Sequence, residues 1–181
     1  MRITLLLVLG LSLPSSQDPR SDAAMLRQAQ QLAVPVAQHQ RLQRLTGEWK
    51  VASQSMGATS EGAVAGKAML GGRYVVLSYR LPRAGRELEA VQLLGFDTLH
   101  QVYTSSWRDD ASTWAVEASG SPDPEAPDRL VLRGSVCDAR DASGRPYRIE
   151  FDLGVADAVT VVMYDTIDGK DVCVETQRWR R

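Results

Sequence analysis

The sequence contains no asparagine, only three lysines among its 21 basic residues, and only two histidines and two cysteines. Without asparagine, an Asn-x-Ser/Thr glycosylation acceptor cannot exist. Basic and acidic residues nearly balance, at 21 and 22, so no basic surface for nucleic acid is indicated. These absences exclude nucleic acid as an expected partner and favour no particular function.

The two cysteines allow at most one disulfide, between Cys137 and Cys173. They fall on separate expected strands, with two other strands between them in sequence, and a bridge requires Cα atoms within about 7 Å. The sequence is therefore compatible either with a disulfide between the two cysteines or with two free thiols. Neither cysteine has the histidine spacing of a metal site or a catalytic setting, so we expect no metal and no cofactor.

The chain also lacks an apolar run long enough to span a bilayer. Residues 1–16 instead have the pattern of a secretory signal: Arg2, a short apolar run over Ile3–Leu13, and the break Pro14-Ser15-Ser16. We expect this segment to be removed. The mature protein would then be secreted or periplasmic, with no stable membrane span after processing.

Two helical segments are expected before the main domain. Residues 17–35 form a polar and helical lead-in, in which Ser21 or Asp22 can cap a helix over Ala23–Ala33. A second helix is predicted over Val36–Leu45, after Pro35. Its residues Val36, His39, Leu42 and Leu45 recur at intervals of three and share one face. His39 is therefore predicted to point inward.

The domain over residues 36–181 is predicted to be mainly β. Short extended segments separated by turn residues follow one another at the spacing typical of sandwiches and barrels. The expected strands are Trp49–Met56, Gly62–Leu70, Tyr74–Leu81, Leu88–Phe96, Gln101–Arg108, Thr113–Ser119, Leu130–Cys137, Tyr147–Leu153, Ala158–Thr166 and Val172–Arg180. Because closure alone removes exposed strand edges, we favour an antiparallel up-and-down β-barrel of about ten strands, capped by the second helix.

Local patterns support this assignment. Tyr147–Leu153 alternates strictly between apolar and charged residues, which predicts one buried and one solvated face. Asp168-Gly169 is the strongest hairpin signal, and Gly71-Gly72 is another turn. The segment Ser119–Asp128, rich in proline and acidic residues, is expected to be a mobile surface loop.

Several short motifs in order resemble a bacterial family known as domain of unknown function fifteen seventy-nine, which is grouped with the lipocalin-like calycins. They are His39 and Leu42 before Gly47-Glu48-Trp49, then Leu70-Gly71-Gly72-Arg73, Leu94-Gly95-Phe96-Asp97, Tyr103 with Trp107 and Asp109, and Val174-Glu175 with Arg178. The resemblance implies a calycin-like β-barrel and carries no established activity.

Two other barrel families are similar at the start of the domain. Lipocalins begin with a Gly-x-Trp motif, to which Gly47-Glu48-Trp49 is similar, and haem-binding nitrobindin-type barrels carry a histidine before it. Those barrels hold haem iron through a histidine near the chain end. Here the histidines are His39 and His100, so the resemblance does not extend to haem ligation.

Large aromatic and charged side chains are the candidates for a ligand site in the barrel: His39, Trp49, Arg73, Tyr79, Trp107, Tyr164 and Arg178. Each has a structural alternative. His39 can tie the helix to the barrel, and the aromatic residues can plug its floor. Arg73 and Arg178 can lie over the Trp49 ring or over the closing helix, or they can bind a carboxylate.

Three functions follow from these residues. The leading one is binding of a small apolar or amphipathic ligand inside the barrel. The alternatives are a filled barrel with a structural or interaction role in the cell envelope, and an enzyme that uses His39 with an interior carboxylate or arginine. No nucleophile-elbow, zinc-protease, phosphate-loop or CxxC motif is present, so catalysis is not favoured and no catalytic residue is assigned.

Overall fold

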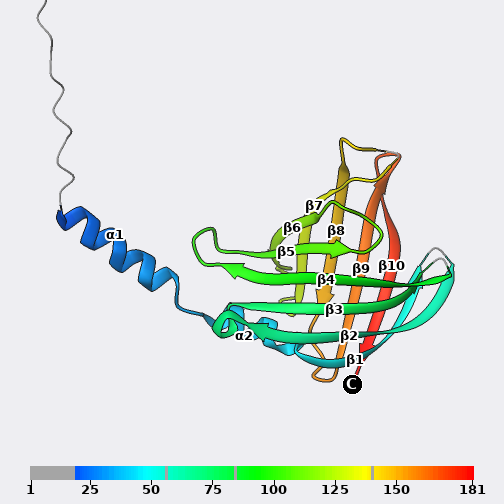
Figure 1. Cartoon of the computed structure of the whole chain (residues 1–181), viewed down its shortest axis with the longest axis horizontal. Helices are drawn as coiled ribbons and strands as arrows, with labels where there is room; N and C mark the ends of the chain where they lie inside the picture. The colour runs from blue at the N-terminus through cyan, green and yellow to red at the C-terminus, as the bar shows by residue number, and fades with distance from the viewer. Residues whose placement is uncertain (1–18, 56, 84, 140) are drawn as a thin grey trace, which may run out of the picture. The chain divides into compact units, whose positions relative to one another are not determined.

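The computed structural model describes residues 19–55, 57–83, 85–139 and 141–181. The expected signal segment, residues 1–16, lies outside them. The α-helices and strands are labelled in Figure 1. The elements are α1 (Pro19–Leu32), α2 (Ala37–Leu42), the 3-10 turn η1 (Gln43–Leu45), β1 (Gly47–Ser55), β2 (Ala58–Met69), the 3-10 turn η2 (Leu70–Gly72), β3 (Tyr74–Arg83), β4 (Arg86–Asp97), β5 (Val102–Asp109), β6 (Val116–Pro122), β7 (Arg129–Val136), β8 (Arg145–Asp152), β9 (Ala158–Ile167) and β10 (Lys170–Arg180).

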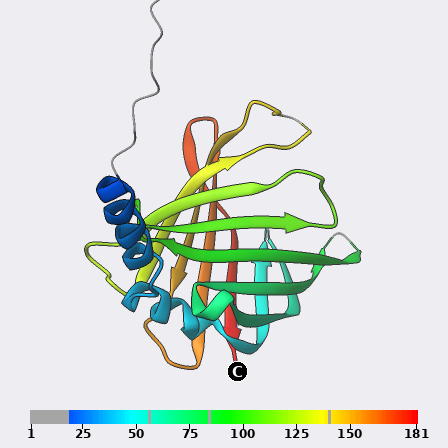
Figure 2. The ribbon, with the colours of Figure 1, turned by 60° about the vertical axis from the view of Figure 1, so that its left-hand side comes forward.

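The ten strands form a closed antiparallel barrel in chain order, as predicted. Each strand pairs with its sequence neighbours, and β10 returns to pair with β1, where Lys50 lies opposite Arg180. Figure 2 shows the strands following one another around the barrel, with β10 next to β1. Closure leaves no unpaired edge that could recruit another chain.

Alternation along the strands places every second residue inside the barrel. In β8, Ile149 and Phe151 are buried, and Leu153 continues the same face beyond the strand end. This confirms the predicted buried face of Tyr147–Leu153. The hairpin between β9 and β10 turns at Asp168 and Gly169, both with positive φ (51° and 73°), as the Asp-Gly signal predicted.

One end of the barrel is closed by the predicted helix, found as α2 followed by the 3-10 turn η1. The inward-facing residues of this segment, His39, Leu42 and Leu45, are buried against the barrel. Trp49 at the start of β1 donates its indole N–H to the Leu45 carbonyl at 3.1 Å, so the floor and the cap are bonded. Gly66 on β2 allows the Leu45 carbonyl to lie close to the barrel wall, because a Cβ at this position would be 2.0 Å from the Leu45 oxygen.

The Trp49 ring packs against Trp179 at a centroid distance of 6.2 Å. The cation over Trp49 is Arg181, whose guanidinium lies 4.7 Å from the ring centroid. The expectation that Arg73 or Arg178 would stack there is wrong. Arg178 lies on β10 with its side chain outward, and Arg73 hydrogen-bonds to the Leu70 carbonyl at 3.0 Å.

The proline-rich segment Ser119–Asp128 is shorter as a loop than predicted. Its first residues, through Pro122, belong to β6 and pair with β7. The remainder is held by Arg129, which makes two hydrogen bonds to the Asp123 carboxylate, and by Asp128, which lies within 4 Å of both Arg41 and Arg44. The loop thus fastens the cap to the barrel.

The lead-in helix α1 belongs to a separate unit from residues 35–181. It begins earlier than predicted, at Pro19, so that Asp22 lies in its first turn and is not its cap. A carboxylate there interacts favourably with the positive end of the helix dipole. Across the described ranges, no helix is long and apolar enough to cross a membrane.

Candidate functional site

The end of the barrel opposite α2 contains a cavity of about 340 Å³. The cap lies where β1 begins, so the cavity end is where β3, β5 and β7 finish and β10 starts. This volume is within the lower range of small-molecule sites. The lining residues come from eight strands and from two loops at the open end, after β5 and after β7.

The cavity wall is largely apolar. Trp107, Val116, Ile149 and Met163 line it, and Tyr147 joins them from β8. Trp107 packs against the buried Tyr79 at a centroid distance of 4.9 Å, and Tyr79 also meets Trp179 at 5.8 Å. These aromatic contacts connect the cavity to the filled core behind it, so the cavity is the unfilled portion of one continuous interior.

A chain of buried polar side chains crosses the base of the cavity. The Tyr79 hydroxyl donates to the Gln92 Oε1 at 2.6 Å, and the Gln92 amide donates to the Ser105 Oγ at 2.7 Å. Burial raises the pKa of Tyr79 well above its usual value, so its phenol stays protonated and acts as a donor. The chain fixes the Gln92 amide at the cavity surface.

Glu175 is the centre of a second polar cluster. Its Oε1 accepts hydrogen bonds from Ser53 at 2.9 Å and from Gln177 at 2.7 Å. Its Oε2 lies 3.3 Å from the Arg83 guanidinium. Trp179 in turn donates to Gln177 at 2.9 Å. A buried carboxylate is tolerated when it is paired and hydrogen-bonded in this way.

Tyr147 faces the same cavity. Burial raises the pKa of its phenol above the usual value, and the nearby Glu175 carboxylate adds to the effect. Tyr147 therefore presents an O–H group and not a phenolate at neutral pH. Neither cavity-end tyrosine is suited to act as a base.

Asp109 ends β5 at the rim of the cavity. Its Oδ2 accepts the Trp107 indole N–H at 2.7 Å, and its Oδ1 accepts the Ala111 backbone N–H at 3.0 Å. These bonds orient both the carboxylate and the neighbouring indole ring.

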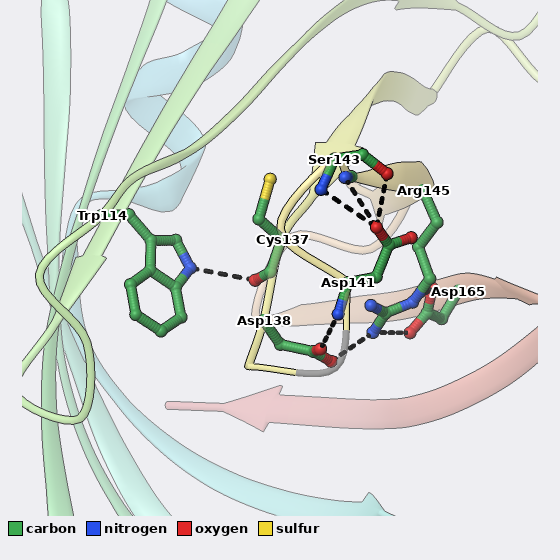
Figure 3. A network of polar contacts seen from close by, with 8 residues as sticks. Trp114, Cys137, Asp138, Asp141, Ser143, Arg145 and Asp165 are labelled. Atoms are coloured by element: carbon green, nitrogen blue, oxygen red, sulfur yellow. Dashed lines mark hydrogen bonds and ion pairs between the residues drawn. The ribbon is translucent and has the colours of Figure 1, made fainter.

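The loops after β5 and after β7 line the open end of the cavity, here called the mouth, and Figure 3 shows the hydrogen bonds that hold them. The Trp114 indole donates to the Cys137 carbonyl at 2.9 Å, which joins the loop after β5 to the loop after β7. Arg145 bonds both oxygens of Asp165 at 2.7 Å and also reaches Asp138 at 2.9 Å. The Asp165 hydrogen bonds raise the pKa of Arg145, which keeps the ion pair charged.

Of the residues predicted to bind a ligand, Trp107 lines the cavity and Tyr79 lies directly behind it. Trp49 lies in the floor next to the cap, on the filled side of the barrel. The other four do not line this cavity. They are His39, Arg73, Tyr164 and Arg178.

His39 joins the cap to the barrel. Its Nδ1 accepts the Val36 backbone N–H at 3.0 Å, and its ring also hydrogen-bonds to the backbone of Phe96. The Phe96 ring meets the imidazole edge-on at 5.8 Å. Burial lowers the pKa of His39, so the ring is neutral at neutral pH, and its Nδ1 is occupied by the Val36 N–H. This geometry gives the enzyme hypothesis no support from His39.

Tyr164 and Arg178 face outward. Tyr164 lies on β9 opposite Arg148, whose guanidinium is 3.9 Å from the centre of its ring. Arg178 is exposed on β10 between the inward Gln177 and Trp179. Alternation along a strand separates these outward residues from the interior, so neither contributes to the cavity.

Cys137 and Cys173 are free thiols, so the disulfide left open by the sequence is not formed. The Cys137 residue follows β7 and lines the cavity, whereas Cys173 is exposed on β10, and β8 and β9 lie between the two strands. This separation across the sheet prevents a bridge.

Sequence reasoning missed the polar residues of the cavity base, namely Gln92, Ser105 and Gln177, and assigned no site role to Glu175. All four are buried. The sequence pattern that could have identified them is alternation along the strand, since Gln92 lies on the same inward face of β4 as Leu88, Ala90 and Leu94. A polar residue in an otherwise apolar inward series needs a partner, which marks it as a network or site residue.

Within the described part of the chain, no group of three or more His, Cys, Asp or Glu side chains is arranged to hold a metal ion. Comparison with curated proteins gives no match. A family described as "Protein of unknown function (DUF1579)" matches residues 34–181, which include α2 and all ten strands. The closed barrel is consistent with the calycin-like fold that the sequence resemblance implied. The chain belongs to this DUF1579 family.

Proposed function

We propose that this protein is an exported binding protein that holds a small amphipathic ligand in the open end of its barrel. The observation that carries the proposal is the cavity of about 340 Å³, which has an apolar wall and a polar base. Ligand sites commonly combine a mostly apolar lining with a few fixed polar groups. The Gln92 amide and the Glu175 carboxylate are such groups, and both are already positioned by hydrogen bonds.

Export is supported by the sequence of residues 1–16, with Arg2 before a short apolar run. Intact-mass analysis of the protein from fractionated host cells tests it. The expected species lacks the first 16 or so residues and lies outside the cytoplasm. Leu7→Arg, which places a charge in the apolar run, should retain the full-length chain in the cytoplasm. A full-length cytoplasmic wild-type protein contradicts export.

Native mass spectrometry of protein purified from its own host tests ligand binding. The expected result is a reproducible mass excess that disappears on denaturation. Ala118→Leu should abolish the excess, because Ala118 is buried and lines the cavity, where a larger side chain would occupy ligand space. The matched control Ala63→Leu adds the same atoms to an exposed, outward position of β2 and should retain the excess.

Two outcomes oppose ligand binding. Protein that carries no excess mass from its host favours the filled barrel with a structural or interaction role. An excess that persists unchanged in folded Ala118→Leu places the bound molecule elsewhere on the protein. Circular dichroism of both variants establishes that each is folded before the masses are compared.

A further inference from the structure

The carboxylates that line the cavity are not all paired with a cation. Four side chains that are charged at neutral pH line it: Arg83, Asp109, Asp165 and Glu175. Glu175 is paired with Arg83, and Asp165 is paired with Arg145 from outside the lining. Asp109 is the carboxylate left over.

Among the residues that the structure describes, no cation lies within 4 Å of the Asp109 carboxylate. Arg86 acts on it electrostatically, but that guanidinium is bonded to Asp110 at 2.7 Å. The two donors to Asp109 are neutral N–H groups, from Trp107 and Ala111. Since a carboxylate offers about four acceptor positions, Asp109 has free acceptor capacity beside these two donors.

An unpaired carboxylate favours a cationic group, and the aromatic residues nearest to Asp109 in sequence favour one as well. Trp107 and Trp114 both line the cavity, and each indole N–H is already bonded, to Asp109 and to the Cys137 carbonyl respectively. The rings therefore have no free polar edge and can offer a ligand only their carbon surfaces. The face of an indole ring carries negative electrostatic potential, which attracts cations.

We propose that the ligand carries a positively charged nitrogen, as in an organic ammonium compound, and that this group is seated at Asp109 beside the Trp107 and Trp114 rings. The apolar body of the ligand would then contact Ile149 and Met163 on the wall. This inference rests on the proposed binding function and specifies the chemistry of the molecule bound.

Calorimetry with three probes of similar shape tests the inference: benzyltrimethylammonium, its neutral carbon analogue neopentylbenzene, and the anion phenylmethanesulfonate. The wild-type protein should bind the cation about tenfold more tightly than the neutral analogue, and the anion least of all. Added salt should weaken cation binding and leave neutral binding unchanged.

Asp109→Asn removes the charge and keeps an oxygen that can accept the Trp107 N–H. It should reduce affinity for the cation about tenfold and leave affinity for the neutral probe unchanged. Asp152→Asn is the matched control, because this carboxylate is exposed at the end of β8 and does not line the cavity. Trp114→Leu, at a residue that is 44% exposed, removes the ring together with its hydrogen bond to the Cys137 carbonyl. It should weaken binding of the cation more than binding of the neutral probe.

The outcomes separate the two proposals. If the neutral or anionic probe binds as tightly as the cation, or if Asp109→Asn and Asp152→Asn behave alike, the cationic ligand is overturned and the binding function survives. If none of the three probes binds the wild-type protein, the cationic-ligand inference is overturned, and the mass excess in native mass spectrometry decides the binding function separately.

Discussion

At the scale of the residue, His39 shows how one polar side chain can secure an end of a barrel. Its imidazole bridges the start of α2, through the Val36 N–H, and strand β4, through the Phe96 backbone. The bridge requires a neutral ring, since a protonated Nδ1 can no longer accept a hydrogen bond. The attachment of the cap is therefore sensitive to acid.

We predict that His39 makes the fold less stable in mild acid. Burial sets the folded pKa of His39 below the unfolded value, so the unfolded chain takes up a proton first as pH falls below about 6.5. The contribution of His39 is complete above that pH and is lost as pH falls toward the folded pKa. Urea unfolding at about pH 7.5 and pH 5.5 should show this loss in the wild type.

His39→Gln should cost about 1 kcal/mol of unfolding free energy at neutral pH and should flatten the acid dependence. His100→Gln is the comparison variant, because it removes a histidine that is 69% exposed in a turn, where it bonds Asp97 and does not touch the cap. An equal loss of stability between the two pH values in wild type and His39→Gln would remove His39 as the cause.

The residue scale is also where sequence reasoning reached least far. Alternation correctly predicts which residues of a strand face inward, but it does not say at which depth the barrel is filled. Trp49 and Trp107 are both inward aromatics, yet Trp49 lies in the floor under the cap and Trp107 lines the cavity. Their depth depends on strand tilt and stagger, which no single strand sequence contains.

At the scale of the element, the mouth depends on the loop between β7 and β8. Asp141 accepts hydrogen bonds from the Ser143 and Gly144 backbone N–H groups, which gives the loop its own turn. These bonds lower the pKa of Asp141, with the Ser143 side chain as the main cause. Arg145 then joins the loop to β9 through Asp165.

We predict that Arg145→Gln loosens this loop. The variant should lower the unfolding free energy by about 1 to 2 kcal/mol, and the Ser143 and Gly144 amides should exchange about tenfold faster with solvent. Hydrogen exchange followed by mass spectrometry or NMR measures the change. Arg133→Gln, at an exposed position of β7 without an ion pair within 4 Å in the described ranges, is the control. Unchanged exchange in Arg145→Gln would show that the loop holds itself.

Elements were predictable where local chemistry decides them. All ten strands were placed, and the Asp168-Gly169 hairpin was identified, because alternation and positive φ are encoded by neighbouring residues. The extent of the Ser119–Asp128 loop was not. Proline and acidic composition favoured a long loop, whereas pairing of β6 with β7 and the Asp123–Arg129 ion pair depend on contacts that local composition does not contain.

At the scale of the whole molecule, the barrel unit and the family match nearly coincide. Residues 35–181 form one unit, and the family match covers residues 34–181. The helix α1 lies outside both. All of the cavity-lining residues belong to the barrel unit.

We predict that a protein consisting of residues 35–181 folds without the preceding segment. Its thermal midpoint should lie within about 3 °C of that of the longer chain, and it should bind the same ligand with the same affinity. Differential scanning calorimetry and calorimetric titration measure the two quantities. A midpoint lowered by about 10 °C or more would show that the segment before residue 35 stabilises the barrel.

Pairing of β1 with β10 has a consequence for the order of events during synthesis. The first strand leaves the ribosome early, but one of its two partners is the last strand of the barrel to emerge. Contacts between distant parts of a chain form slowly, because a long loop must close before they contribute. The barrel can therefore close only after β10 has been translated. Until then one edge of β1 has no partner strand, so the last strand to be made is also the one that removes the open edge of the first.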